Sequence, residues 1–210
     1  MKTHIESISE DRAEGELARV YQEWFRDNPG RQAVPDILRC FSQRPDFLRD
    51  VNAISDRIHF SDGHLDYQTK ERIATYASAL NQCRYCKGMH ATFLRQQGED
   101  AEVVSALGCA HGDIAALSPA DRELLRFVEI LTTHSHLCTA DDIQRLRDVG
   151  WSDPQMAEAV YVTALFAFFN RVANAFGLQM PRNDQFANPP ESSEFTQGTP
   201  TPETDSEDRK

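Results

Sequence analysis

The sequence lacks the long apolar run that a membrane-spanning protein requires. The longest apolar stretch covers positions 159–169 and is interrupted by Thr163, whereas a membrane-spanning helix needs about 20 consecutive apolar residues. Residues 1–6 also lack the apolar segment of a secretory signal peptide. We therefore expect a soluble, cytoplasmic protein with no membrane partner, and we interpret positions 159–169 as part of a buried core helix.

Basic residues are in the minority. The 210 residues include 22 Lys plus Arg against 33 Asp plus Glu, which gives a net charge of -11. A protein with this charge repels nucleic-acid phosphates and anionic lipid surfaces. We expect no nucleic-acid partner.

Cysteines are few, and only one pair is close in sequence. The five cysteines are an odd number, and a chain of this length can bury an adequate core without disulfides. Thiols also stay reduced in an intracellular protein, so a disulfide framework is a poor explanation for them. We interpret the three isolated ones as small buried apolar residues: Cys40, Cys109 and Cys138.

Helical spacing of apolar residues runs through the chain, and no convincing pair of strands is found. Residues suited to N-caps precede several of these stretches, and glycines stand where they end. The expected fold is therefore all-α, a helical bundle. The predicted helices are 13–27, 35–41, one opening at Pro45, 67–80, 83–97, 100–107, one opening after Ser118, 139–150 and 152–176.

Composition predicts one domain followed by a tail. We expect residues 1–60 to form an N-terminal helical arm of the same domain, and residues 61–182 to form its core. Residues 183–210 are rich in Pro, Ser, Thr and acidic residues, and such a segment cannot bury enough apolar surface to offset its ordering entropy. We predict a disordered acidic tail, which is either a solvated appendage or a partner-binding segment.

Residues 83–90 (CRYCKGMH) carry the strongest chemical signal. Cys83, Cys86 and His90 stand at i, i+3 and i+7, so they share one face of the predicted helix. Two thiols across a first helical turn can form a disulfide, and the unpaired N–H groups there stabilise a thiolate. His90, one turn beyond Cys86, can accept a thiol proton. The pattern predicts a redox-active dithiol with its own base.

The imidazole needs a group that orients it, and Glu71 is the candidate. Helices 67–80 and 83–97 are separated by a tight break, so they can pack antiparallel and bring Glu71 towards His90. The alternative is an exposed helix acid that pairs with a neighbouring base.

Zinc binding is the main rival to redox chemistry, and purely structural cysteines are the third interpretation. The motif supplies three ligands, but a closed zinc site needs a fourth, and no second Cys or His pair with suitable spacing is present. We therefore predict neither a metal nor a cofactor. The other histidines give no paired signal and are interpreted as structural, surface or capping residues: His59, His64, His111, His134 and His136.

The site motif resembles that of the alkyl hydroperoxidase D (AhpD)-like group in the carboxymuconolactone decarboxylase superfamily. The resemblance lies in Glu71, Cys83-x-x-Cys86 and His90, and residues 81–86 (NQCRYC) are similar to the family's Asn-x-Cys-x-Tyr-Cys form. Two further segments resemble a branch called peroxidase-related: 34–38 (VPDIL) and 168–174 (FFNRVAN).

This resemblance implies an all-helical fold, a homo-oligomer and reduction of a hydroperoxide. It further implies that Cys86 attacks the peroxide and becomes a sulfenic acid, which Cys83 resolves as a disulfide. His90 would deprotonate Cys86, Glu71 would complete the proton relay, and an external dithiol donor would restore the thiols.

One position departs from AhpD, which has a histidine immediately before its second motif cysteine. Tyr85 stands there in this chain, and its phenol cannot act as a base near neutral pH. A non-enzymatic redox-responsive oligomeric module, or a decarboxylase or lyase of the same superfamily, therefore remains an alternative to the peroxidase. We interpret four aromatic residues as core or subunit interface rather than as a hydroperoxide pocket: Trp24, Phe166, Phe168 and Phe169.

Overall fold

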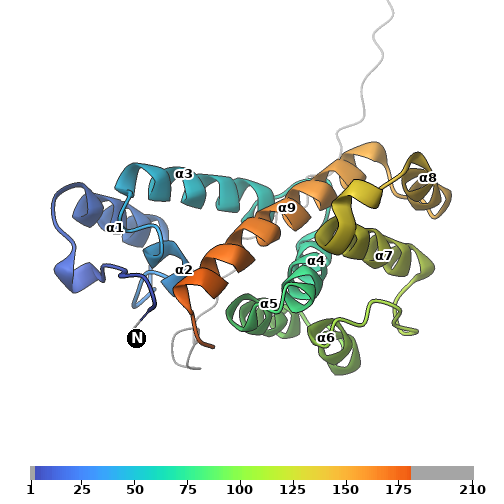
Figure 1. The fold of residues 1–210 in the computed structure, drawn as a ribbon, viewed down its shortest axis with the longest axis horizontal. Helices are drawn as coiled ribbons and strands as arrows, with labels where there is room; N and C mark the ends of the chain where they lie inside the picture. Colours follow the sequence, from blue (N-terminus) through green and yellow to red (C-terminus); the bar gives the residue numbers. More distant parts are fainter. Residues whose placement is uncertain (1–2, 181–210) are drawn as a thin grey trace, which may run out of the picture.

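A computed structural model describes residues 3–180. These residues form helices and contain no strand, so the all-α prediction is confirmed. The predicted tail, residues 183–210, lies outside the described part of the chain. In order, the helices are α1 (Gly15–Asp27), α2 (Asp36–Arg39), α3 (Pro45–Ser55), the π-helical turn η2 (Asp56–Phe60), α4 (Tyr67–Leu80), α5 (Arg84–Gln96), α6 (Ala101–Gly108), α7 (Pro119–His134), α8 (Ala140–Asp148) and α9 (Asp153–Phe176) (Figure 1).

Helix α9 connects the two ends of the molecule. Figure 1 shows α1, α2 and α3 at one end, α6, α7 and α8 at the other, and α9 crossing between them. By length and composition alone, α9 could cross a membrane. Ten of its residues are buried in the protein, Val162 and Phe169 among them, which agrees with the predicted core helix.

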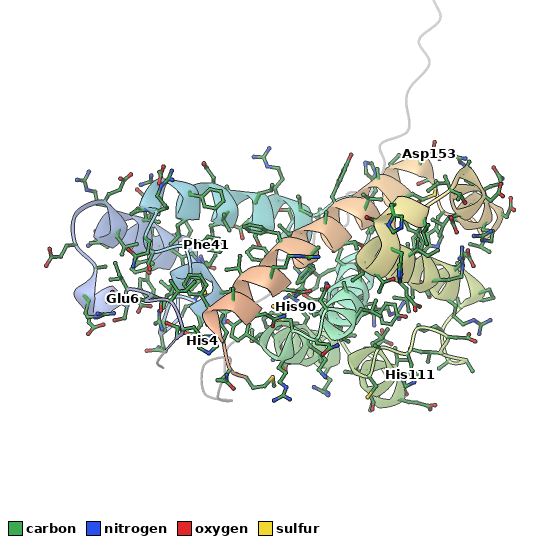
Figure 2. All side chains as sticks on the ribbon, viewed as in Figure 1. His4, Glu6, Phe41, His90, His111 and Asp153 are labelled. Atoms are coloured by element: carbon green, nitrogen blue, oxygen red, sulfur yellow. The ribbon has the colours of Figure 1, made fainter. Side chains whose placement is uncertain are left out.

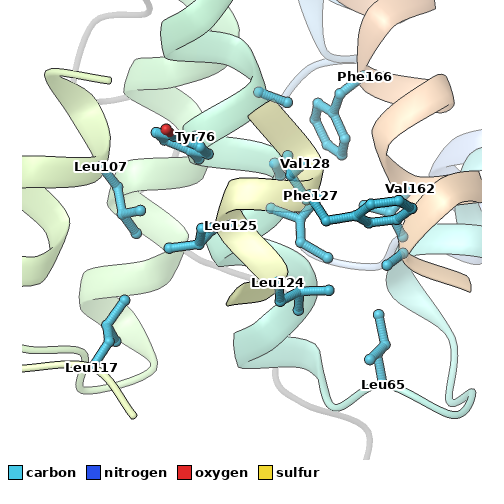
Figure 3. Packing of buried hydrophobic residues seen from close by; sticks show 14 of the residues in the cluster. Leu65, Tyr76, Leu107, Leu117, Leu124, Leu125, Phe127, Val128, Val162 and Phe166 are labelled. Carbon is cyan, nitrogen blue, oxygen red and sulfur yellow. The ribbon is translucent and has the colours of Figure 1, made fainter. Parts of the chain in front are cut away.

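The apolar side chains form two clusters. The first is built around α4, α7 and α9 and includes Leu125, Phe127 and Phe166 (Figure 3). The second joins the N-terminal helices to α5 and the end of α9, and both motif cysteines belong to it. Trp24, Phe166 and Phe169 are buried as expected, whereas Phe168 is 38% exposed and stacks on Phe41.

The capping residues explain why the predicted helix starts were close to the observed ones. The Ser118 side chain accepts the Asp121 N–H at the start of α7. Capping boxes at Thr139 and Ser152 begin α8 and α9. Such caps favour a helix start because they satisfy backbone N–H groups that have no partner inside the helix. Gly177 ends α9 with φ 69°, a left-handed conformation that glycine adopts without strain.

Candidate redox site

The break between α4 and α5 places the two cysteines at the start of a helix. Gln82 has φ 54°, which is uncommon for a residue other than glycine and marks a tight reversal of the chain. The Cys83 N–H donates to the Ser78 carbonyl at 2.9 Å, and Cys83 is the N-cap of α5. As a result α4 and α5 pack against each other, as the sequence predicted.

The two cysteines are free thiols in contact with each other. Their Sγ atoms lie 2.8 Å apart, and the Cys86 N–H donates to Cys83 Sγ at 3.3 Å. The contact with Cys86 lowers the pKa of Cys83 although burial acts to raise it. The same contact, together with burial, raises the pKa of Cys86. Negative charge is therefore best stabilised on Cys83, while the proton of Cys86 needs a base to remove it.

Asn170 of α9 lies beside this pair and is fully buried. Its amide nitrogen donates to Ser78 Oγ at 3.0 Å, and its Oδ1 accepts from the Asn81 amide at 3.0 Å. After the Cys86 contact and the backbone N–H, it is a further hydrogen-bonding group that lowers the pKa of Cys83. Its role was not predicted from the sequence, because only the tertiary fold brings α9 to the α4–α5 break.

Glu71 is buried between two histidines. It has no exposed surface, so the alternative of an exposed helix acid is wrong. One carboxylate oxygen, Oε2, lies 2.7 Å from His90 Nδ1, and the other, Oε1, lies 2.9 Å from His59 Nε2. The structure thus brings Glu71 to His90 and adds His59, which the sequence analysis had treated as structural.

The charges in this group follow from burial and hydrogen bonding. Burial acts to raise the pKa of Glu71, but His90 and His59 outweigh it and lower that pKa to about 2. Burial lowers the pKa of His59 although Glu71 acts in the opposite direction. At neutral pH Glu71 is therefore an anion and His59 is neutral. A nitrogen that faces a carboxylate at this distance carries its proton, so the contact with Glu71 uses Nδ1 of His90 as the donor and leaves Nε2 outside it.

The contact of His59 with Glu71 was not predicted, because the backbone around His59 is not a regular helix. It lies on η2, a single π-helical turn, and such turns change the direction of side chains relative to a regular helix, often at functional sites. The following loop is held by Lys70, whose Nζ donates to the Ser61 carbonyl at 2.9 Å and pairs with Glu158 at 2.7 Å. No spacing rule for a regular helix predicts this arrangement.

His90 lies in the middle of the molecule, under α9 (Figure 2). Its side chain is 12% exposed, and its ring packs edge-on against Phe166 with centroids 4.5 Å apart. Cys86 is one turn before it on α5. His59, Glu71 and His90 therefore form one buried group, and α5 links it to the dithiol because His90 is one turn beyond Cys86. The remaining predicted structural histidines of the described chain are exposed: His64, His111, His134 and His136.

The isolated cysteines lie outside this group. Cys40 is buried, as expected, but Cys109 is exposed and Cys138 is only partly buried. The prediction of a buried apolar role is therefore wrong for Cys109, which follows the end of α6 in a turn.

A metal would find a different set of ligands from the one considered in the sequence. His59, Glu71 and His90 have ligand atoms within 4.8 Å of one another, and the cysteines are not part of that set. Both carboxylate oxygens, however, already have an imidazole partner at hydrogen-bond distance. The observed contacts therefore account for the buried charge of Glu71 without an ion.

Comparison with known proteins supports the resemblance seen in the motif. Residues 45–108, which include Glu71, both motif cysteines and His90, match the model of the carboxymuconolactone decarboxylase family. The predicted resemblance to this superfamily is confirmed. A comparison with curated proteins finds no match.

Several solved structures share the fold. One is described as an alkylhydroperoxidase AhpD core, an uncharacterized peroxidase-related protein from Ralstonia eutropha JMP134, with 26% identity and a TM-score of 0.75 over 89% of this chain and 95% of that one. An uncharacterized peroxidase-related protein from Silicibacter sp. TM1040 has 25% identity and a TM-score of 0.75 over 89% of this chain and 95% of that one. The debrominase Bmp8, at 18% identity and TM-score 0.68 over 86% and 93%, shares the fold alone. The AhpD-like helical fold is thus confirmed.

Acid is expected to destabilise the protein below a pH of about 6.5 because of His59. Since burial lowers the pKa of His59, the unfolded chain binds a proton below about pH 6.5 while the folded protein does not. The free energy of unfolding should then fall by up to about 1.4 kcal/mol per pH unit until the folded-state pKa is reached, with no contribution above about pH 6.5. Urea unfolding at pH values from about 7.5 to about 5 measures this slope.

Two variants separate His59 from the other histidines. His59→Gln should flatten the slope, and His136→Gln, at an exposed position, should leave it unchanged. Equal slopes in the wild type and His59→Gln would contradict the assignment of His59 as a buried neutral imidazole.

Proposed function

We propose that the protein is a thiol-dependent peroxidase that reduces a hydroperoxide with the Cys83–Cys86 pair. The observation that carries this proposal is the contact of two free thiols at a helix start, 2.8 Å apart, on the same helix as an imidazole that a buried carboxylate orients at 2.7 Å. The description of the Ralstonia eutropha relative as an AhpD core and peroxidase-related protein is consistent with it.

In the proposed reaction Cys86 is the nucleophile. His90 accepts its thiol proton through Nε2, and the thiolate attacks one peroxide oxygen. The O–O bond breaks, Cys86 becomes a sulfenic acid, and the alcohol or water leaves with the proton held by His90.

The second step forms the disulfide. Cys83, whose pKa is lowered by its contact with Cys86, attacks the sulfur of the sulfenic acid. Its thiol proton goes to the departing hydroxide, which leaves as water. An external dithiol then reduces the disulfide and is itself oxidised. The assignment gives each cysteine the role that suits its environment, because the Cys83 thiol has the lowered pKa and Cys86 is the cysteine one helical turn from His90.

We also propose a cytoplasmic location and self-association, with no membrane or nucleic-acid partner. A reducing compartment would keep both thiols available for turnover. Exposed apolar side chains on and around α3 and α9 provide surface suited to a second copy of the chain: Phe47, Ile54, Phe60, Tyr161 and Phe168.

The test is hydroperoxide consumption in the presence of dithiothreitol. We expect repeated turnover by the wild type, and one equivalent of peroxide without reductant should give a Cys83–Cys86 disulfide in peptide mass spectrometry. Cys109→Ser removes an exposed thiol remote in sequence from the motif and should leave the rate unchanged. A single oxidation without turnover would instead favour a redox-responsive module, and two unmodified thiols would refute the proposal.

A further inference from the structure

We infer that His59 is a positioning residue for the proton relay: it fixes the Glu71 carboxylate, which in turn holds His90 with Nδ1 protonated and Nε2 free to accept a proton. The catalytic consequence rests on the proposed peroxidase reaction. The effect on the His90 tautomer does not, and it can be measured without any substrate.

The two carboxylate oxygens of Glu71 have different partners. Each has one imidazole partner, His59 Nε2 at 2.9 Å and His90 Nδ1 at 2.7 Å. A carboxylate held at one oxygen only can rotate about its last bond, whereas two donors on different helices fix its plane. His59 reaches Glu71 from η2 and His90 reaches it from α5, so the carboxylate is fixed between two independent elements.

The backbone that carries His59 is itself fixed. Glu158 of α9 accepts the Leu65 N–H at 2.8 Å and pairs with Lys70 at 2.7 Å, and Lys70 is 1% exposed. These contacts tie the loop after η2 to both α4 and α9. The His59 ring also packs edge-on against Phe166 with centroids 5.0 Å apart. His59 therefore has little freedom to leave Glu71.

The other ionisable groups around His59 and Glu71 do not replace this contact. From α4, Tyr67 stays protonated because burial and then Glu71 raise its pKa, and Lys70 is paired with Glu158 of α9. From η2 itself, burial raises the pKa of Asp56, which accepts from Asn52. From α5 come His90 and the two thiols. Tyr67 also hydrogen-bonds the Glu71 carboxylate, but it lies on the same helix as Glu71 and so does not tie that side chain to a second element. His90 does so from α5, with its Nδ1 at 2.7 Å from Oε2.

A relay fits the protonation of His59 better than a metal does. Nδ1 of His59 is buried and has no hydrogen-bond partner. If Nε2 bound an ion, the ring proton would move to Nδ1, where a buried N–H would have no acceptor, which is costly. When Nε2–H donates to Glu71, Nδ1 carries no proton. The buried atom without a partner is then an acceptor rather than an N–H donor.

The experiment compares His59→Leu with His59→Gln. Leucine fills the space without a donor, whereas glutamine places an amide N–H near the position of Nε2. In reduced wild-type protein, NMR of the ring nitrogens should show His90 as the Nδ1–H tautomer. We expect a mixture of tautomers in His59→Leu and the wild-type tautomer in His59→Gln.

The pH profile of peroxide consumption is the second readout. Loss of one hydrogen bond to a buried carboxylate makes the Glu71–His90 pair take up a proton more easily, so the acidic limb should move up by about one pH unit in His59→Leu. The rate at neutral pH should fall about tenfold. His59→Gln should restore both. A merely structural role would lower stability in both variants without moving the limb or the tautomer.

Two results would overturn the inference. One is a wild-type tautomer and pH profile in His59→Leu; the other is a stoichiometric metal in wild-type protein that is lost in His59→Leu, which would make the group a metal centre. If His59→Leu fails to fold, His59→Asn replaces it, because its shorter amide cannot reach Glu71. If the wild type consumes no peroxide, the proposed function fails while the tautomer comparison still decides the role of His59.

Discussion

Cys86→Ser is expected to lower the steady-state rate of hydroperoxide consumption by about 1000-fold or more. A serine hydroxyl is not ionised near neutral pH and cannot accept a peroxide oxygen to form a sulfenic acid, so the first step has no substitute nucleophile. Cys86 is 4% exposed, and serine fits the same space, so the variant should remain folded. The measurement is the initial rate with excess dithiothreitol, with circular dichroism as the check on folding.

Cys83→Ser is the matched variant for this experiment. It should still consume one equivalent of peroxide and then stop, because a sulfenic acid forms on Cys86 but no neighbouring thiol resolves it. Trapping with dimedone would identify the modified cysteine. If the sulfenic acid appears on Cys83 in the Cys86→Ser protein instead, the roles of the two cysteines are the reverse of those proposed.

Glu71→Gln is expected to lower the rate by about 100-fold. The amide keeps the shape of the side chain, but one of its two ends becomes a donor and meets the N–H of His90 or His59, whose contacts with Glu71 are now 2.7 and 2.9 Å. One imidazole must then turn or change tautomer, and the relay loses its anion. The rate and its pH dependence together measure the effect.

Glu102→Gln serves as the control for removing one negative charge. Glu102 is an exposed acid in the first turn of α6, outside the buried group, and its substitution should leave the rate within about twofold of the wild type. An unchanged rate in Glu71→Gln would contradict the relay and would leave the dithiol without an oriented base.

The helices were largely predictable because their signals are local. The observed α4, Tyr67–Leu80, has the predicted limits, and Ser118, Thr139 and Ser152 begin helices as their capping chemistry suggested. The turn at Asp56–Phe60 was not predicted. A π-helical turn uses the same residue types as a regular helix, and its geometry is imposed by the packing around it.

The residues of the site were predictable only where their signals are local. Cys83, Cys86 and His90 lie within one short helical segment, so their spacing was sufficient to group them. Glu71 required a guess about how two helices pack, and the left-handed Gln82 provides the necessary reversal. His59 and Asn170 come from η2 and α9. The segment 168–174, which contains Asn170, showed a family resemblance, but nothing in its sequence places it beside the cysteines.

The burial of the sulfur atoms has a consequence for the supply of electrons. Cys83 and Cys86 are 1% and 4% exposed, and a donor thiol must approach one of these sulfurs in line with the disulfide to exchange with it. In the proposed reaction, a bulky donor could not do so while the pair stays buried beside Asn170 of α9. The rate at which the disulfide is reduced would then be limited by a local opening of the protein around the two sulfurs. Above a certain donor concentration, adding more donor would not increase that rate.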